Sequence, residues 1–161
     1  MKGMSRAPRS MALMMAAGFF ATGCGDDPVE PLPFEVIDEV TFHESLGVDL
    51  DAMEVTDAGV YWRDIEVGDG DVAEPGVRAY LTYDVRFRDG TMAEPPNRSG
   101  VYDFLVDAAD GTMEGFHEGV RSMRVGGERK FIVPPELGTR QGGPFGILIF
   151  DVVLDSIAAP S

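Results

Sequence analysis

Histidine and cysteine, which often perform acid–base, nucleophilic or metal chemistry, are sparse in this chain of 161 residues. His43 and His117 are its only histidines, they lie in different regions, and neither has a neighbouring set of metal ligands. Cys24 is the only cysteine, so no disulfide bond can form within the chain. We therefore expect no metal ion and no cofactor, and the candidate chemistry is left to apolar and aromatic side chains.

Aromatic residues recur on segments that have the period of a strand. Val77–Phe87 alternates strictly between apolar and polar residues, and Tyr83 lies on its apolar face. This pattern predicts a half-buried antiparallel strand, and the pair Asp89-Gly90 predicts a tight turn after it. Four other segments are predicted strands, one of which ends at proline because proline cannot donate to a sheet: Gly59–Gly70, Val101–Val106, Arg129–Pro135 and Gly146–Ile157.

A single helix is predicted over Glu114–Met123. Phe116, Val120 and Met123 recur there at helical spacing, and Gly126 follows as a stop signal. Strands outnumber helices, and the one helix lies between strands. The order of elements therefore predicts an α+β domain with an antiparallel sheet.

Residues 1–23 have the features of a secretory signal peptide. Met1–Ser10 is basic, and Met11–Ala21 is an apolar run that is too short to span a bilayer. The letters that follow, ATGC, resemble the bacterial lipobox, in which the cysteine is lipidated and becomes the mature N-terminus. The resemblance predicts lipidation at Cys24 and a membrane anchor in a bacterial cell envelope. The alternative is an ordinary signal peptide followed by a free thiol.

The charge of the chain is strongly negative, with a formal net charge of −15. Residues 24–58 contain eleven acidic residues and no Lys or Arg, so we interpret them as an acidic tether and N-terminal extension. Cys24–Pro33 is the tether itself, whereas scattered apolar residues in Phe34–Met53 could pack on the domain as an extra strand. No basic cluster exists beyond the first ten residues, which excludes nucleic acid as a partner.

A family resemblance rests on four segments. Their order and spacing are similar to those of the FKBP-type peptidyl-prolyl cis-trans isomerases: GVYWRDIEVGDG, YLTYDVRFRDG, MEGFHEGVRSMRVGGERKFIVPPELG and LIFDVVL. The resemblance covers about Gly59–Ile157, so residues 59–158 are predicted to form an FKBP-like domain. It implies a twisted antiparallel sheet wrapped around one short helix, with a groove between them that binds a proline-containing peptide segment.

The resemblance also implies site residues. Five positions match the family's catalytic pocket: the aromatic residues Tyr83, Tyr102, Phe116 and Phe150, and Met113, whose backbone N–H would bind the substrate carbonyl. Phe104 matches a further aromatic position that would contact the substrate. Taken alone, an aromatic residue on the inner face of a strand is more often part of the core.

Three other substrate-binding positions depart from the family pattern. Ala93 stands where an aromatic residue is usual, Glu94 where aspartate is usual, and Thr139 where a tyrosine usually donates a hydrogen bond to the peptide. The following loop, 140–146, is also short. Loss of one aromatic wall would cost about 1–3 kcal/mol of apolar contact, so weakened catalysis is expected.

Prolyl isomerisation suits this set of residues because it needs no acid, base, nucleophile or metal. Its barrier of roughly 18–20 kcal/mol comes from amide resonance, and a partly dry apolar pocket favours the twisted amide, which has lost much of its dipole. The expected function is therefore a peptidyl-prolyl isomerase that assists folding of client proteins in the envelope. Two alternatives stay open: an FKBP-like peptide-binding or chaperone module with little turnover, and a structural lipoprotein whose tether is the working part.

Overall fold

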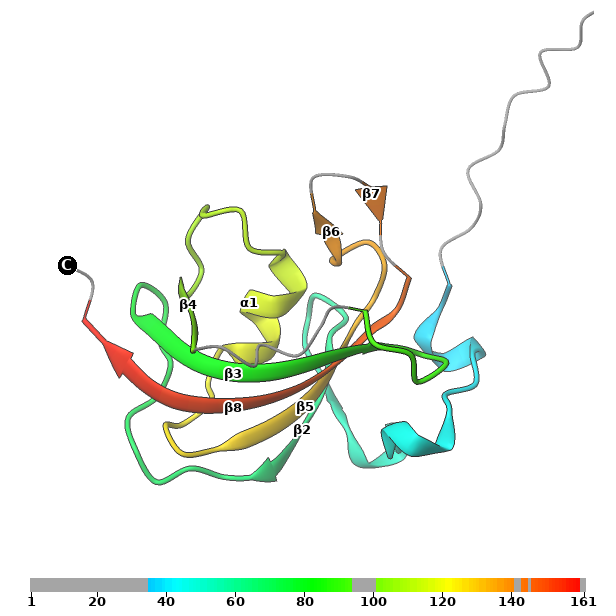
Figure 1. The fold of residues 1–161 in the computed structure, drawn as a ribbon, viewed down its shortest axis with the longest axis horizontal. Coiled ribbons are helices and arrows are strands. Elements are labelled where there is room, and N and C mark those ends of the chain that lie inside the picture. The colour runs from blue at the N-terminus through cyan, green and yellow to red at the C-terminus, as the bar shows by residue number, and fades with distance from the viewer. Residues whose placement is uncertain (1–34, 94–100, 141–142, 145, 160–161) are drawn as a thin grey trace, which may run out of the picture. The chain divides into compact units, whose positions relative to one another are not determined.

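A six-stranded antiparallel sheet is the main element of the structure (Figure 1). The computed structural model describes residues 35–93, 101–140, 143–144 and 146–159. Neighbouring strands follow the order β1-β2-β5-β8-β3-β4 along the sheet. The strands are β1 Glu54–Val55, β2 Tyr61–Glu66, β3 Arg78–Phe87, β4 Tyr102–Leu105, β5 Glu128–Val133 and β8 Leu148–Ala158.

One α-helix, α1 (Glu114–Val120), packs on one face of this sheet, as Figure 1 shows. Two further strands, β6 (Thr139–Arg140) and β7 (Gly143–Pro144), pair only with each other. Between residue 35 and β1 the chain forms three 3₁₀ turns: η1 Ile37–Glu39, η2 Glu44–Leu46 and η3 Leu50–Ala52. No helix in the described part of the chain is long and apolar enough to cross a bilayer. The structure thus confirms the predicted α+β class with an antiparallel sheet.

The strand β3 keeps the predicted alternation. Ala79, Leu81 and Val85 are buried, whereas the residues between them are partly exposed. The Asp-Gly turn follows as predicted: Phe87 N–H donates to Thr91 O at 2.9 Å, and Gly90 adopts a φ of +84°, which glycine tolerates without strain. Local sequence chemistry therefore determines both this strand and its turn.

The helix α1 ends at Val120, three residues before the predicted end. Arg121 has already left the helical region, and Ser122 has a positive φ of 68°. Met123 is nonetheless fully buried, because the chain turns there and inserts this side chain into the core. The periodic spacing of Met123 was therefore a sign of burial and not of helix.

Successive residues of β5 and β8 contribute to two separate apolar clusters, because side chains alternate between the two faces of a sheet. Phe131 and Phe150 belong to the main core beneath α1. Ile132 and Ile149 point to the opposite face and belong to a smaller cluster. Both faces of the sheet centre are consequently covered.

The smaller cluster is completed by the segment that comes before β1. Ile37 of η1 and Leu46 of η2 are buried in one cluster with Ile147, which directly precedes β8. The expectation of an extra strand within Phe34–Met53 is wrong for residues 35–53, which form three 3₁₀ turns and their connections, and β1 begins only at Glu54. Part of the predicted extension thus packs on the sheet, whereas the predicted tether, Cys24–Pro33, lies outside the described residues.

Candidate functional site

An aromatic cluster fills the space between α1 and the sheet. Phe116 of α1 lies at its centre and is 3 % exposed. Its ring contacts rings from four strands, mostly edge to face, with centroid distances of 5.2–5.9 Å: Tyr83 of β3, Tyr102 and Phe104 of β4, Phe131 of β5 and Phe150 of β8. Edge-to-face pairs at these distances are favourable beyond their burial alone. The cluster therefore fixes the helix on the sheet.

The cluster has a buried floor and a partly exposed rim. Phe104, Phe116 and Phe150 are buried, whereas Tyr83 and Tyr102 are only half-buried. The two tyrosine rings meet edge to face at 5.6 Å, and Tyr102 Oη lies 3.2 Å from Thr112 Oγ1. Solvent therefore reaches this otherwise apolar cluster at the tyrosines, where a bound apolar side chain could displace it.

Register within the sheet explains why these rings meet. Leu81 of β3 pairs with Tyr102, and Val85 of β3 pairs with Phe150. Paired residues lie on the same face of a sheet, so Tyr83, between Leu81 and Val85, points to the same face as both partner rings. The alternating sequence of β3 thus positions one wall of the site.

Close approach of α1 to β5 requires glycine. A Cβ added at Gly119 would overlap ring atoms of Phe131, and one added at Gly115 would overlap the Val133 side chain. The helix can therefore place Phe116 deep in the cluster only because two positions on its inner side lack side chains.

Met113 is the N-cap residue that directly precedes α1, and it lies at the rim of the same core. Its carbonyl accepts hydrogen bonds from Phe116 N–H at 3.0 Å and His117 N–H at 3.3 Å. Among the described residues, none accepts a hydrogen bond from Met113 N–H. Helix starts leave such donors unsatisfied by the helix itself, so this group can donate to a bound carbonyl.

The loop before Met113 is held by a buried histidine and an aspartate. His117 Nδ1 accepts a hydrogen bond from Asp107 N–H at 3.0 Å, and His117 Nε2 lies 3.7 Å from Asp110 Oδ1. Burial acts to raise the pKa of Asp110, but hydrogen bonds from Thr112 and Leu105 and the nearby His117 outweigh it and leave the pKa lowered. A charged Asp110 therefore orders the loop that leads to the candidate donor.

The other end of α1 is capped by Arg129, a residue to which the sequence analysis assigned no role. Arg129 is 3 % exposed, and its Nη1 donates to Gly119 O at 3.2 Å and Arg121 O at 2.9 Å. Its Nε donates to Asp64 at 2.7 Å, and its guanidinium lies 4.1 Å from the Trp62 ring centroid. The only sequence signal for this arrangement was an arginine at an inward position of a predicted strand.

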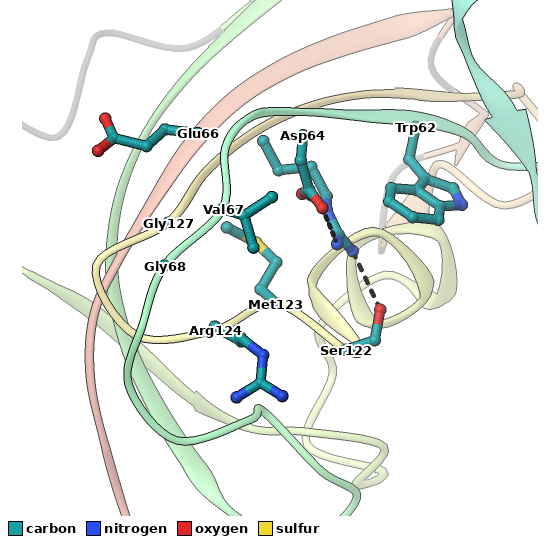
Figure 2. Close-up of a pocket in the computed structure, with 10 residues that line it drawn as sticks. Trp62, Asp64, Glu66, Val67, Gly68, Ser122, Met123, Arg124 and Gly127 are labelled. Carbon is teal, nitrogen blue, oxygen red and sulfur yellow. Dashed lines mark hydrogen bonds and ion pairs between the residues drawn. The ribbon is translucent and has the colours of Figure 1, made fainter.

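A hollow of about 210 Å³ lies beside this arginine, and Figure 2 shows Trp62, Asp64 and Ser122 around it. Three of its polar side chains already bond one another: Asp64 and Ser122 both accept from the Arg129 guanidinium. We therefore interpret this region as support for the end of α1 and not as the functional site.

The structure brings together the five aromatic side chains predicted from the sequence, namely Tyr83, Tyr102, Phe104, Phe116 and Phe150. Met113 and Ala93 pack, half-buried, against the same core. Thr139 lies in β6, and its side chain is not described. Glu94 and Cys24 lie outside the described residues. Seven of the predicted residues thus lie in or against the main core, and their roles stay predictions.

An antiparallel sheet that packs one short helix through an aromatic cluster defines the class of this protein. The family model described as FKBP-type peptidyl-prolyl cis-trans isomerase matches residues 70–155. The chain therefore belongs to the FKBP-type peptidyl-prolyl cis-trans isomerase family.

The chain is also similar to individual curated proteins, and one of the two described next is named as an FKBP-type isomerase. The chain is 35% identical over 106 residues to the photosynthetic NDH subunit of lumenal location 4 from Arabidopsis thaliana, a match that covers 61% of this chain and 48% of the relative. It is 28% identical over 114 residues to the FKBP-type isomerase FkpA of Escherichia coli, covering 67% and 42%. The chain thus spans about half or less of the length of these curated relatives.

Solved structures show the same fold. The crystal structure of FkpA from Escherichia coli matches with a TM-score of 0.60 and 23% identity, over 73% of this chain and 56% of that chain. The crystal structure of AtFKBP13 matches with a TM-score of 0.56 and 23% identity, over 66% of this chain and 98% of that chain. The predicted FKBP-like architecture is therefore confirmed.

Proposed function

We propose that this protein is a peptidyl-prolyl cis-trans isomerase that binds proline-containing segments of client proteins. The single observation that supports this best is the half-buried rim of the aromatic cluster next to a Met113 N–H that no described residue accepts. The ring of a proline fits an apolar, aromatic-walled surface, and the N–H holds the peptide while the bond rotates. No acid or base is required, because the barrier is the amide resonance itself.

The mechanism is differential binding of the twisted amide. The planar amide has a large dipole that water stabilises, and rotation about the C–N bond removes much of that dipole. Contact with Tyr83, Tyr102 and Phe116 replaces water around the bond, so the twisted form loses less solvation than the planar form does. The hydrogen bond from Met113 anchors one side of the peptide, so that rotation is confined to the imide bond.

The decisive experiment removes the Met113 N–H without removing the fold. Proline at position 113 matches the observed φ of −64° and has no N–H. In the full chain, Met113→Pro should lower kcat/KM for short Xaa-Pro peptides about tenfold or more, measured by exchange NMR or a protease-coupled assay. Met113→Ala, which keeps the N–H, is the matched control and should retain most of the activity.

Thermal unfolding of both variants shows whether any loss of activity comes from loss of the folded structure. Equal activity of the two variants at equal stability would exclude Met113 N–H as the anchor. A wild-type chain that fails to accelerate any Xaa-Pro peptide would exclude the isomerase assignment.

A peptide-binding module with little turnover is the second candidate, and Ala93 favours it. This small side chain packs half-buried against the main core next to β3, where a larger ring would add apolar contact. Binding of proline peptides without acceleration would support the module. Ala93→Phe should then increase the turnover if the missing wall limits catalysis.

We also propose that the protein acts outside the cytoplasm, anchored in a bacterial envelope by a lipid on Cys24. The sequence around Cys24 supports this, and the name of one relative places that relative in a chloroplast lumen. Expression of the full gene with a radiolabelled fatty acid should label the wild type and leave Cys24→Ser unlabelled. A labelled Cys24→Ser variant, or an unlabelled wild type, would contradict the anchor.

A further inference from the structure

Glu35 lies between two segments that are far apart in the sequence. Its Oε1 accepts a hydrogen bond from Arg88 Nε at 2.8 Å, and a Cβ on Gly146 would lie 3.7 Å from its Oε2. Arg88 belongs to the turn after β3, and Gly146 comes shortly before β8. A hollow of about 210 Å³ separates the two segments and is lined by Glu35, Phe87, Arg88, Asp89, Gly146 and Ile147. One carboxylate therefore reaches both sides of this hollow.

The segment around η2 holds the same turn from another direction. His43 N–H donates to Arg88 O at 2.9 Å. A Cβ on Gly90 would lie 3.1 Å from Ser45 Oγ, which in turn lies 2.8 Å from His43 Nδ1. The turn after β3 is therefore held by a backbone hydrogen bond and by close contact, and Figure 1 shows this cyan segment beside the end of β3.

Apolar burial attaches the extension to the second segment as well. Ile37 and Leu46 share one buried cluster with Ile147 and Ile149. The Glu35–Arg88 pair itself is too exposed, at 39% and 43% of its side chains, to contribute much stability. The apolar cluster supplies the stability, and the ion pair supplies the geometry.

Both segments continue directly into the aromatic site. The chain returns from the turn along β3, where Ala93 N–H donates to Val85 O at 3.0 Å and so places Ala93 on the main core. From Ile147 the chain enters β8, which brings Phe150 into contact with Phe116. A shift of either segment would therefore move a residue of the candidate site.

We propose that residues 35–53 form a brace that positions the proline-peptide site from the opposite face of the sheet. Glu35 is its main positioning residue, because its carboxylate bonds Arg88 in the turn after β3 and lies beside Gly146 at the entrance of β8. The inference rests on the proposed function, since it concerns the same peptide site. This acidic segment, which is remote from the peptide, thus affects how tightly the peptide is held.

The first test breaks the link and then restores it. In the full chain, Glu35→Gln and Arg88→Gln should each lower kcat/KM for an Xaa-Pro peptide about threefold to tenfold, chiefly by raising KM. The charge swap Glu35→Arg with Arg88→Glu should recover at least half of that loss. Glu39→Gln removes the same charge from an exposed position in η1 and should change nothing.

The second test does not depend on activity. Amide hydrogen exchange should become faster in Glu35→Gln at both Arg88–Ala93 and Gly146–Leu148, and should stay unchanged in the centre of β5. Faster exchange at both segments in a chain that accelerates no peptide would support the brace and reject the proposed isomerase. An active chain in which Glu35→Gln matches Glu39→Gln in activity and in exchange would reject the brace and leave the isomerase intact.

Discussion

At the scale of single residues, Phe116 links the helix to every wall of the candidate site. Its ring contacts rings from β3, β4, β5 and β8 while remaining almost fully buried. Phe131 of β5 is buried in the same cluster, but its ring contacts only Phe116 and Phe150 among the described rings. The two residues therefore separate the contribution of an aromatic floor from that of an ordinary core ring.

Replacing Phe116 by leucine should damage function more than stability. Leucine keeps most of the buried apolar volume, so we expect a loss of about 1–2 kcal/mol in the free energy of unfolding. The ring contacts with Tyr83 and Tyr102 disappear, and kcat/KM for prolyl isomerisation should fall at least about tenfold. Phe131→Leu should cost similar stability with little loss of activity, as measured by urea unfolding and peptide kinetics. Equal loss of activity in both variants would contradict a special role for Phe116.

Tyr61 provides a pH probe of the brace. Donation of a hydrogen bond to Asp38 Oδ1 at 2.7 Å, with burial and the negative charge of Asp38, raises the pKa of Tyr61 above 10.0. Because the pKa of Tyr61 is higher in the folded protein, its hydrogen bond to Asp38 contributes to stability below pH 10. This contribution is lost as the pH rises through the raised pKa. Ionisation of Tyr61 changes the ultraviolet absorbance, and this change is identified as the part that is missing in Tyr61→Phe. In the wild type it should therefore appear above pH 10. In Asp38→Asn it should move to lower pH, and an unmoved signal would contradict the hydrogen bond.

At the scale of elements, the close packing of α1 on β5 depends on Gly119. Alanine usually stabilises a helix relative to glycine by about 1 kcal/mol, but here its Cβ would overlap the Phe131 ring. Gly119→Ala should therefore lower the free energy of unfolding by about 1–3 kcal/mol, and should reduce peptide binding because Phe116 moves with the helix. Gly138→Ala, where the added atom would be 3.6 Å or more from its neighbours, should be tolerated. A stabilised Gly119→Ala protein would show that the helix shifts freely.

The loop before α1 should make stability depend on pH in the acid range. Because the pKa of Asp110 is lowered below 3.8 in the folded protein, the unfolded state binds more protons there. The stabilisation is present above about pH 3.8 and is lost as the pH falls through the lowered value. Urea unfolding of Asp110→Asn should show lower stability at neutral pH and a smaller decline between pH 4 and pH 2 than the wild type. An identical decline in both proteins would contradict this role.

At the scale of the whole molecule, the sheet has a core on each face, and the second core needs the N-terminal extension. Leu46 is buried there with Ile132, Ile147 and Ile149. Without the extension these sheet residues would face water. Residues 35–53 are therefore part of the folded domain and not a separate linker.

Truncation of Leu46 to alanine should show this cooperativity. The cavity and the lost burial should lower the free energy of unfolding by about 2–5 kcal/mol. Unfolding followed by far-ultraviolet circular dichroism and by Trp62 fluorescence should still give one coincident transition, because β2 pairs with β1 and β5. Leu50→Ala, at the partly buried margin of the same cluster, should cost less. A negligible loss in Leu46→Ala would mean that the extension does not stabilise the sheet.

Elements with local signals could be predicted from the order of the residues. The alternation of Val77–Phe87, the Asp-Gly turn, the start of the helix at Glu114 and the stop at Pro134 each follow from backbone sterics or from a periodic pattern. The aromatic residues of the candidate site were also predictable, because they lie on the apolar faces of those elements and match a family pattern.

Features that depend on contacts between distant segments could be seen only in the folded chain. The partners of Arg129, the packing of Ile37 and Leu46 on the outer face of the sheet, and the link from Glu35 to Arg88 join residues up to 112 positions apart. No periodic signal marks such pairs, because each 3₁₀ turn is only three residues long. The free energy that fixes the extension comes from burial against Ile132, Ile147 and Ile149, and that surface exists only after the sheet has formed.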